Sequence, residues 1–135
     1  MNKYVLGFLF DKNREQVLLI KKNRPEWQYG LLNGIGGKVE DNELPIDAMC
    51  REFSEETDYE IPTVWYNFGK LSGEGFEISL FSATTSNNLK EIGPKTDEKL
   101  QVCKVKNLPK NTITNLHWII PMASKDNQIY NIQEC

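Results

Sequence analysis

Cysteine and histidine are scarce in this chain, and the shortage argues against two classes of protein. The 135 residues include three cysteines and one histidine. The cysteines, Cys50, Cys103 and Cys135, are odd in number and none belongs to a CxxC pair. This pattern argues against a disulfide framework and against a zinc site. We therefore expect the cysteines to be core or surface thiols.

Long apolar runs are also missing. No stretch approaches the roughly 18 consecutive apolar residues that a membrane-spanning helix needs. The first twelve residues, MNKYVLGFLFDK, contain a short apolar segment, but no small-residue cleavage site follows it. We expect a cytoplasmic protein that does not enter a membrane, with one domain over residues 1–135 and a monomeric or homodimeric state.

Positive charge is not in excess, because 16 Lys and Arg residues face 19 Asp and Glu residues and give a net charge of −3. A chain of this kind has no general positive field to attract a nucleic-acid backbone, so we expect no stable nucleic-acid binding. A polyanionic ligand would have to be held locally. The cations that could hold such a ligand are Lys21, Lys22, Arg24 and Lys38. Alternatively, each of them is a solvated charge in a loop.

Alternation and turn residues predict a chain of strands interleaved with two helices. The predicted strands are 4–10, 16–21, 64–71, 76–84 and 100–105, and the predicted helices are 45–57 and 116–124. The first two strands form a hairpin, and Pro45 suits the first turn of its helix. Residues 34–37 include three glycines, which let the backbone approach a ligand closely. The order of elements suggests a three-layer α/β/α sandwich.

Three carboxylates share one face of the first predicted helix. Glu52, Glu55 and Glu56 stand at i, i+3 and i+4, so they repel one another unless a positive group lies between them. Carboxylate oxygens suit the hard cations Mg²⁺ and Mn²⁺, and Mg²⁺ commonly completes its shell with substrate phosphate oxygens. The spacing therefore predicts phosphate chemistry. The alternative is a solvated helix face that pairs with Arg51.

The run from residue 37 to residue 59 resembles the Nudix box, GX5EX7REUXEEXGU, in which U is a bulky apolar residue. The matching positions are Gly37, Glu43, Arg51, Glu52, Phe53, Glu55, Glu56 and Tyr59. Asp58 stands where the family has its last glycine. Because that glycine normally takes a left-handed conformation at a helix end, we expect some strain at Asp58 and no loss of activity.

The resemblance implies the Nudix fold, an α/β/α sandwich with a central mixed sheet, and a set of site residues. Glu52, Glu55 and Glu56 would hold Mg²⁺ or Mn²⁺, with the backbone near Gly37 as a further ligand. The family places the acid at Glu43 opposite Arg51 as an architectural ion pair. The catalytic residues would be Glu52, Glu55 and Glu98. The general base among them would be either a glutamate of the box or Glu98. The alternative for Glu98 is an acid at a loop tip.

Upstream of the box, LLNGIGGK resembles the entrance of the MutT-type enzymes that clear oxidised purine triphosphates. Asn33 would read a purine edge, although asparagine before glycine is also a good turn residue. Lys22, Lys38 and Asn115 complete the predicted substrate-binding residues. Trp27 or Trp118 would stack on the base unless they belong to the core. An acid pair that precedes the tryptophan in those enzymes is missing, because Thr114 and Asn115 occupy that place.

These features predict an enzyme whose partner is a small nucleotide. The reaction is hydrolysis of a nucleoside triphosphate, with 8-oxo-dGTP as a candidate, to the monophosphate and pyrophosphate. ADP-ribose, a sugar nucleotide or a dinucleoside polyphosphate remains an alternative substrate, although residues 64–93 lack the proline usual in the ADP-ribose type. A non-catalytic nucleotide sensor is the other alternative, but such relatives usually lose box glutamates.

Overall fold

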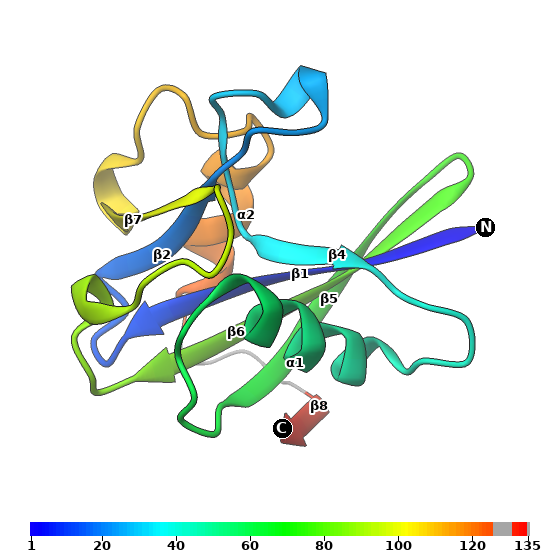
Figure 1. Cartoon of the computed structure of the whole chain (residues 1–135), viewed down its shortest axis with the longest axis horizontal. Coiled ribbons are helices and arrows are strands. Elements are labelled where there is room, and N and C mark those ends of the chain that lie inside the picture. The colour runs from blue at the N-terminus through cyan, green and yellow to red at the C-terminus, as the bar shows by residue number, and fades with distance from the viewer. Residues whose placement is uncertain (126–130, 135) are drawn as a thin grey trace.

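A mixed sheet forms the centre of the molecule, as the computed structural model shows for residues 1–125 and 131–134 (Figure 1). Its central strand, β1, pairs in parallel with β6 along its full length and antiparallel with β2 and β4. The strands are β1 (Asn2–Asp11), β2 (Gln16–Lys21), β3 (Leu32–Asn33), β4 (Ile35–Lys38), β5 (Val64–Gly73), β6 (Phe76–Thr85), β7 (Lys99–Lys104) and β8 (Asn131–Glu134). The order β3-β2-β1-β6-β5-β8 is completed by β4 beside β1 and β7 beside β2.

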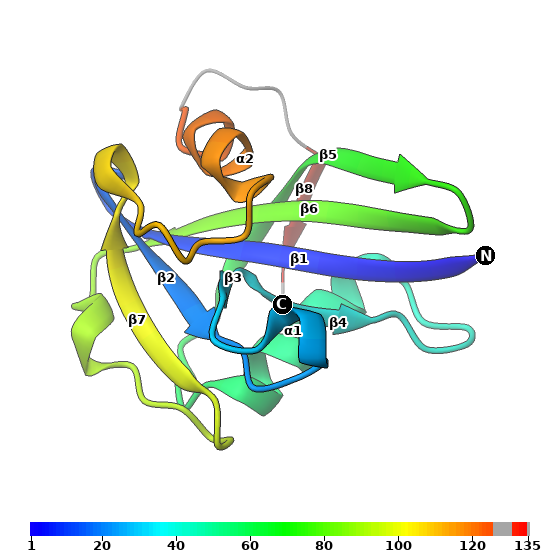
Figure 2. The same ribbon diagram turned by 90° about the horizontal axis from the view of Figure 1, so that it is seen from above.

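Two helices cover opposite faces of this sheet, α1 (Pro45–Glu56) on one side and α2 (Leu116–Ala123) on the other (Figure 2). Short 3₁₀ turns, η1 (Glu26–Gln28), η2 (Leu89–Glu91) and η3 (Val105–Asn107), lie in the connections. The predicted three-layer sandwich with a mixed sheet is confirmed. Among the described residues, no helix has the length and apolar character needed to cross a bilayer.

Apolar side chains alternate between two cores, one under each helix. Val5 and Leu9 of β1 pack with Met49 and Phe53 of α1, whereas Phe8 of β1 packs with the buried residues of α2. Since successive side chains of a strand point to opposite faces, a strand covered on both sides is apolar at nearly every position. The buried Trp65 fixes α1 from below, with its ring centroid 5.3 Å from that of Phe53.

The predicted elements are present, and their ends differ by a few residues. β2 and α1 begin where the sequence predicts, and Pro45 occupies the first turn of α1. The hairpin between β1 and β2 is confirmed but short, since its pairs are Leu9 with Leu18 and Phe10 with Val17. Sequence reasoning did not predict β3, β4 and β8 as strands.

The cysteine expectation is half right. Cys103 is a buried free thiol, as expected. Cys50 on α1 is disulfide-bonded, so the prediction of thiols alone is wrong there. With three cysteines, at least one must stay unpaired within the chain, but the other two can still form one disulfide bond. Cys135 lies outside the described residues.

Candidate active site

Arg51 organises the acidic face of α1. Its Nε and Nη2 atoms donate to the two carboxylate oxygens of Glu43 at 2.9 and 3.0 Å, which is the bidentate pairing that suits a guanidinium. Nη2 also donates to the Lys38 carbonyl at 2.9 Å, and Nη1 donates to Glu52 at 2.9 Å. The predicted Glu43–Arg51 ion pair is present, and it ties the loop before α1 to the end of β4.

The three box glutamates have unequal environments. The Glu55 side chain is 57% exposed and lies 3.4 Å from Arg51, the i, i+4 pairing that a solvated helix face would also show. The Glu52 side chain is 15% exposed. Burial raises the pKa of Glu52, against the opposing effect of Arg51. Arg51 therefore neutralises part of the acidic face and leaves Glu56 out of its reach.

Glu56 is the carboxylate that the protein leaves unsatisfied. Its Oε2 atom is buried and has no hydrogen-bond partner. Burial raises the pKa of Glu56 to about 7, Lys22 opposes the shift, and the nearby charges of Glu52, Glu98 and Glu55 add to it. A buried carboxylate without a donor is costly unless a cation or a proton compensates it.

Two glycines of β4 leave no space for a side chain at the edge of this site. A Cβ at Gly36 would collide with the Val5 carbonyl oxygen, and a Cβ at Gly37 would collide with the carboxylate of Glu52. The expectation that the backbone here approaches a ligand stays a prediction, and the two glycines also have a structural role. They let β4 lie against β1 and against the side chain of Glu52.

A second group of charges comes from the loop after β2 and the segment before β7. Glu98 is 4% exposed and accepts from Lys22 Nζ at 3.0 Å and from the Asn23 backbone N–H at 2.6 Å. Burial acts to raise the pKa of Glu98, but these hydrogen bonds together hold it below its ordinary value. Arg24 and Asp97 form an exposed bidentate pair beside it, at 3.1 and 2.7 Å.

The segment that follows the helix corrects the expectation for Asp58. Among the described residues other than glycine, positive φ angles occur at Arg14 and Asn42 and nowhere else. Asp58 therefore has no left-handed strain. Its backbone N–H donates to the Gly93 carbonyl at 2.9 Å, and its Oδ1 accepts from the Gly93 N–H at 2.8 Å.

Comparison with known families decides the identity of this arrangement. The model of the NUDIX domain matches residues 2–119, which is most of the chain. The chain belongs to the Nudix family. The prediction of a Nudix pyrophosphohydrolase is confirmed at this level. No curated protein matches the sequence.

Solved structures show the same fold. A Nudix-family hydrolase from Clostridium perfringens is 22% identical, with a TM-score of 0.71 over 91% of this chain and 95% of that one. A MutT Nudix hydrolase from Burkholderia pseudomallei is 20% identical, with a TM-score of 0.68 over 92% and 98%. The dihydroneopterin triphosphate pyrophosphohydrolase of E. coli is 15% identical, with a TM-score of 0.68 over 93% and 94%. At these identities the likeness establishes the fold.

The acidic side chains of the Nudix box are suitable ligands for a divalent metal. In this structure, however, they do not converge on a common point. Nudix hydrolases generally use divalent metal ions. The donors are carboxylates, as a hard cation prefers, and the unpartnered oxygen of Glu56 is the kind of atom that a cation would satisfy. Among the side chains that the structure describes, those of residues 1–125, however, no three His, Cys, Asp or Glu groups converge closely enough to hold an ion. Arg51 holds Glu52 and Glu55 toward itself.

The two amides predicted to read the base belong to β3 and to the start of α2. The Asn33 amide donates to Gln28 at 3.1 Å and its oxygen accepts from the Gly34 N–H at 2.8 Å, so both ends of the side chain serve the turn. Asn115 is the exposed N-cap residue of α2 and makes no side-chain cap bond. The loop before α2 lies against β3, since the Ile113 N–H donates to the Leu32 carbonyl at 3.0 Å.

Aromatic side chains near these amides are open to solvent. Trp27 and Tyr29 are 67% and 70% exposed in the loop before β3, and Trp118 is 52% exposed on α2. The alternative that the two tryptophans belong to the core is therefore wrong. Trp65 is the buried tryptophan. A polar loop with proline and glycine was the available signal that Trp27 is exposed.

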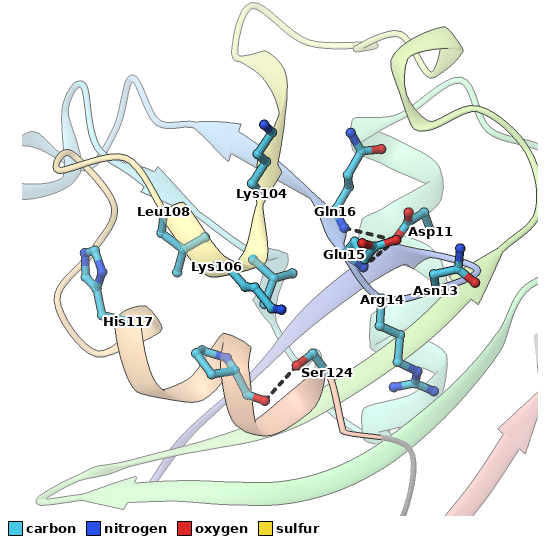
Figure 3. Close-up of a pocket in the computed structure, with 12 residues that line it drawn as sticks. Asp11, Asn13, Arg14, Glu15, Gln16, Lys104, Lys106, Leu108, His117 and Ser124 are labelled. Atoms are coloured by element: carbon cyan, nitrogen blue, oxygen red, sulfur yellow. Dashed lines mark hydrogen bonds between the residues drawn. The ribbon is translucent and has the colours of Figure 1, made fainter.

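A groove is also present in another part of the described residues. It has a volume of about 910 Å³ and lies between the turn after β1, the end of β7 and α2 (Figure 3). No residue of the Nudix box lines it. Several of its polar groups bond within the chain, since Asp11 accepts from the Glu15 and Gln16 N–H groups and Ser124 donates to the Pro121 carbonyl. The groove therefore does not coincide with the predicted site.

Proposed function

We propose that this Nudix hydrolase cleaves a nucleoside triphosphate to the monophosphate and pyrophosphate with the help of Mg²⁺ or Mn²⁺. The observation that carries the proposal is the buried, unpartnered oxygen of Glu56, on the helix that also carries Glu52 one turn earlier and Glu55 directly before it. A protein that used this face only for stability would gain by pairing or replacing that carboxylate.

Glu52, Glu55 and Glu56 would hold the metal, with the backbone near Gly37 beside them. A bound divalent ion would neutralise phosphate oxygens and lower the pKa of a water that attacks phosphorus. The chain's own cation at this place is Lys22, whose side chain is 16% exposed and acts on both Glu98 and Glu56. In this proposal Lys22 contacts a phosphate oxygen while it stays beside the acidic group.

Glu98 is our preferred fourth carboxylate, because it is buried and close enough to Glu56 to raise the pKa of that residue. Both of its oxygens accept hydrogen bonds, which makes it a well-positioned but weak base. Glu55 is the open alternative. Replacing each by glutamine and comparing the pH dependence of kcat separates the two, since the variant that lacks the base loses the acidic limb of the profile.

The exposed aromatic side chains support a base-binding region near Asn115, and Lys38 stays a predicted substrate-binding residue. Trp27 and Trp118 present open faces on which a base can stack. The E. coli neighbour is named for a triphosphate substrate, which favours a triphosphate over ADP-ribose here. Asn33 would contact a base only after its bonds to Gln28 and Gly34 rearrange.

A side-by-side assay tests this function. The protein is incubated with 8-oxo-dGTP, dGTP, CTP or ADP-ribose, in Mg²⁺, in Mn²⁺ and in EDTA, and the products are separated by chromatography. We expect triphosphates to give monophosphate and pyrophosphate with either metal and no turnover in EDTA. Faster cleavage of ADP-ribose would favour the diphosphate-derivative alternative. Calorimetric binding of nucleotides without any turnover would favour a sensing module.

We also propose that residues 1–135 form one domain that acts in the cytoplasm as a monomer or homodimer. Sedimentation measures the mass of the active species. Proteolysis of the native protein tests the single domain, because a second folded unit would survive as a separate fragment.

A further inference from the structure

Residues 93–98, which we name the strap, connect the end of α1 to the loop after β2. The strap begins beside the Nudix box, where Gly93 and Asp58 exchange two hydrogen bonds of 2.9 and 2.8 Å. One of these bonds uses the Asp58 side chain. Asp58 is the position at which the chain departs from the box, and the residue found there has an acceptor that glycine lacks.

The next strap residues continue along the helix end. The Lys95 N–H donates to the Glu56 carbonyl at 3.1 Å, and Lys95 Nζ donates to the Ser54 carbonyl at 2.9 Å. Carbonyl groups of the last helical turn have no partners within the helix, and a positive charge near them is favourable. The first half of the strap is thereby joined to the same turn of α1 that carries Glu55 and Glu56.

The other end of the strap carries Glu98. Its carboxylate accepts from Lys22 and from the Asn23 N–H, and the Asn23 side chain donates to the Asp97 carbonyl at 3.1 Å. The strap thus has one attachment at the last turn of α1, which carries Glu55 and Glu56, and one at the loop that carries Lys22. Its length and attachment set where Glu98 stands relative to Glu56.

Asp58 and Gly93 constrain each other. A Cβ at Gly93 would lie 2.8 Å from Asp58 Oδ2, so a larger residue at 93 would displace the carboxylate. The pair therefore forms a specific contact between helix end and strap.

We propose that Asp58 is a positioning residue that, through Gly93, holds the strap against α1 and so places Glu98 beside Glu56. The expected effect of Asp58 on turnover rests on the proposed function. Its expected effect on the position of the strap rests on the hydrogen bonds alone.

Three variants test this role. Asp58→Ala removes the acceptor for the Gly93 N–H, and Asp58→Asn keeps an oxygen at that place. Asn88→Ala is the matched control, because the Asn88 side chain accepts from the Lys90 N–H at 3.0 Å in the same loop, before the strap. Each alanine variant loses one exposed hydrogen bond from side chain to backbone.

Turnover is the first measurement. We expect Asp58→Ala to lower kcat roughly fivefold, the value of one hydrogen bond. KM stays within twofold, Asp58→Asn recovers most of the loss, and Asn88→Ala keeps the wild-type kcat. In a Glu98→Gln background, Asp58→Ala should have no further effect, because its action passes through Glu98. A wild-type kcat in Asp58→Ala, or the same fivefold loss in the Glu98→Gln background, would overturn the proposal.

Amide hydrogen exchange is the second measurement and does not need activity. Asp58→Ala should lower the protection of the Gly93 and Lys95 amides and also that of the Asn23 amide, which donates to Glu98. Full protection of Asn23 would show that Glu98 is placed without Asp58 and would overturn the proposal. If the wild-type chain hydrolyses no nucleotide, the proposed function fails and the Asn23 amide decides the role of Asp58.

Discussion

The acidic side and the base side of the site differ in how firmly their side chains are held. Arg51 and Glu43 share two hydrogen bonds, and Glu98 accepts from two donors at its two oxygens. On the base side, Trp27 and Trp118 are more than half exposed, and Asn115 makes no side-chain cap bond. In the proposed function, the groups for the chemistry are thus already held within the folded chain, whereas contacts to the base depend on side chains that a ligand would order.

This difference explains why the reaction class is easier to infer than the substrate. Charged groups held in a partly buried setting have fixed partners, so their number and spacing limit what they can do. Exposed aromatic rings accept many planar ligands with similar energies. The predictions below test whether the two sides contribute separately.

The largest effect is expected for Glu56→Gln. Loss of the charged ligand should lower kcat roughly 10²- to 10³-fold, the rate equivalent of several kcal/mol of metal-dependent stabilisation. The fold should be retained, because the change removes a buried charge that has no partner. Initial rates with dGTP and Mg²⁺, and thermal denaturation without metal, measure the two effects. Glu60→Gln, on an exposed glutamate beyond the helix, is the control. Undiminished turnover in Glu56→Gln would remove Glu56 from the site.

The second-largest effect is expected for Arg51→Lys, and it is mainly a loss of stability. A lysine cannot keep the fork to Glu43 together with the bonds to Glu52 and the Lys38 carbonyl. We expect the free energy of unfolding to fall by about 2 kcal/mol, measured by urea denaturation. Arg24→Lys is the matched control, because Arg24 forms the same fork with Asp97 at the surface, where solvent screens the pair and we expect a smaller loss. Equal losses in both variants would contradict the view that the acidic side is the firmly held one.

On the base side, Trp118→Ala should weaken binding and leave the chemical step alone. We expect KM for a triphosphate to rise up to about tenfold with kcat unchanged, since stacking contributes about 0.5–1.5 kcal/mol. Ile61→Ala is the control, because Ile61 is 51% exposed and Trp118 is 52% exposed. A fall in kcat at constant KM would mean that the two sides do not act separately.

The smallest effect is the pH dependence of the stability that the Glu43–Arg51 ion pair contributes. Hydrogen bonding to Arg51 lowers the pKa of Glu43, and the Glu40 N–H adds to the shift. The ion pair therefore contributes its full stability above the ordinary glutamate pKa of about 4.3 and loses it as the pH falls through the lower folded value. The difference in unfolding free energy between wild type and Glu43→Gln should shrink between about pH 5 and pH 3. A difference that stays constant over this range would mean that Arg51 does not lower the pKa of Glu43 in the folded protein.

Local features could be predicted from the sequence because their causes are local. Pro45 marks the start of α1, and alternation marks β2. The i, i+3, i+4 spacing places Glu52, Glu55 and Glu56 on one face without any knowledge of the sheet.

Features that depend on distant partners were missed. The parallel pairing of β1 with β6 joins residues more than 70 positions apart, and no local pattern marks it. The contact of Asp58 with Gly93 depends on where the strap lies, so the residue looked like a strained substitute for glycine. The glycines of β4 face β1 and Glu52, and their sequence is the same whether they face a ligand or the chain.

The pairing of β1 with β6 also has a consequence for biosynthesis. β1 leaves the ribosome well before β6, its parallel partner, which does not end until Thr85. Until then β1 exposes one edge of unpaired N–H and C=O groups, a state that favours association between nascent chains. Fragments that stop before residue 85 should therefore aggregate, and slower synthesis of the first 80 or so residues would prolong the period in which the chain needs a chaperone.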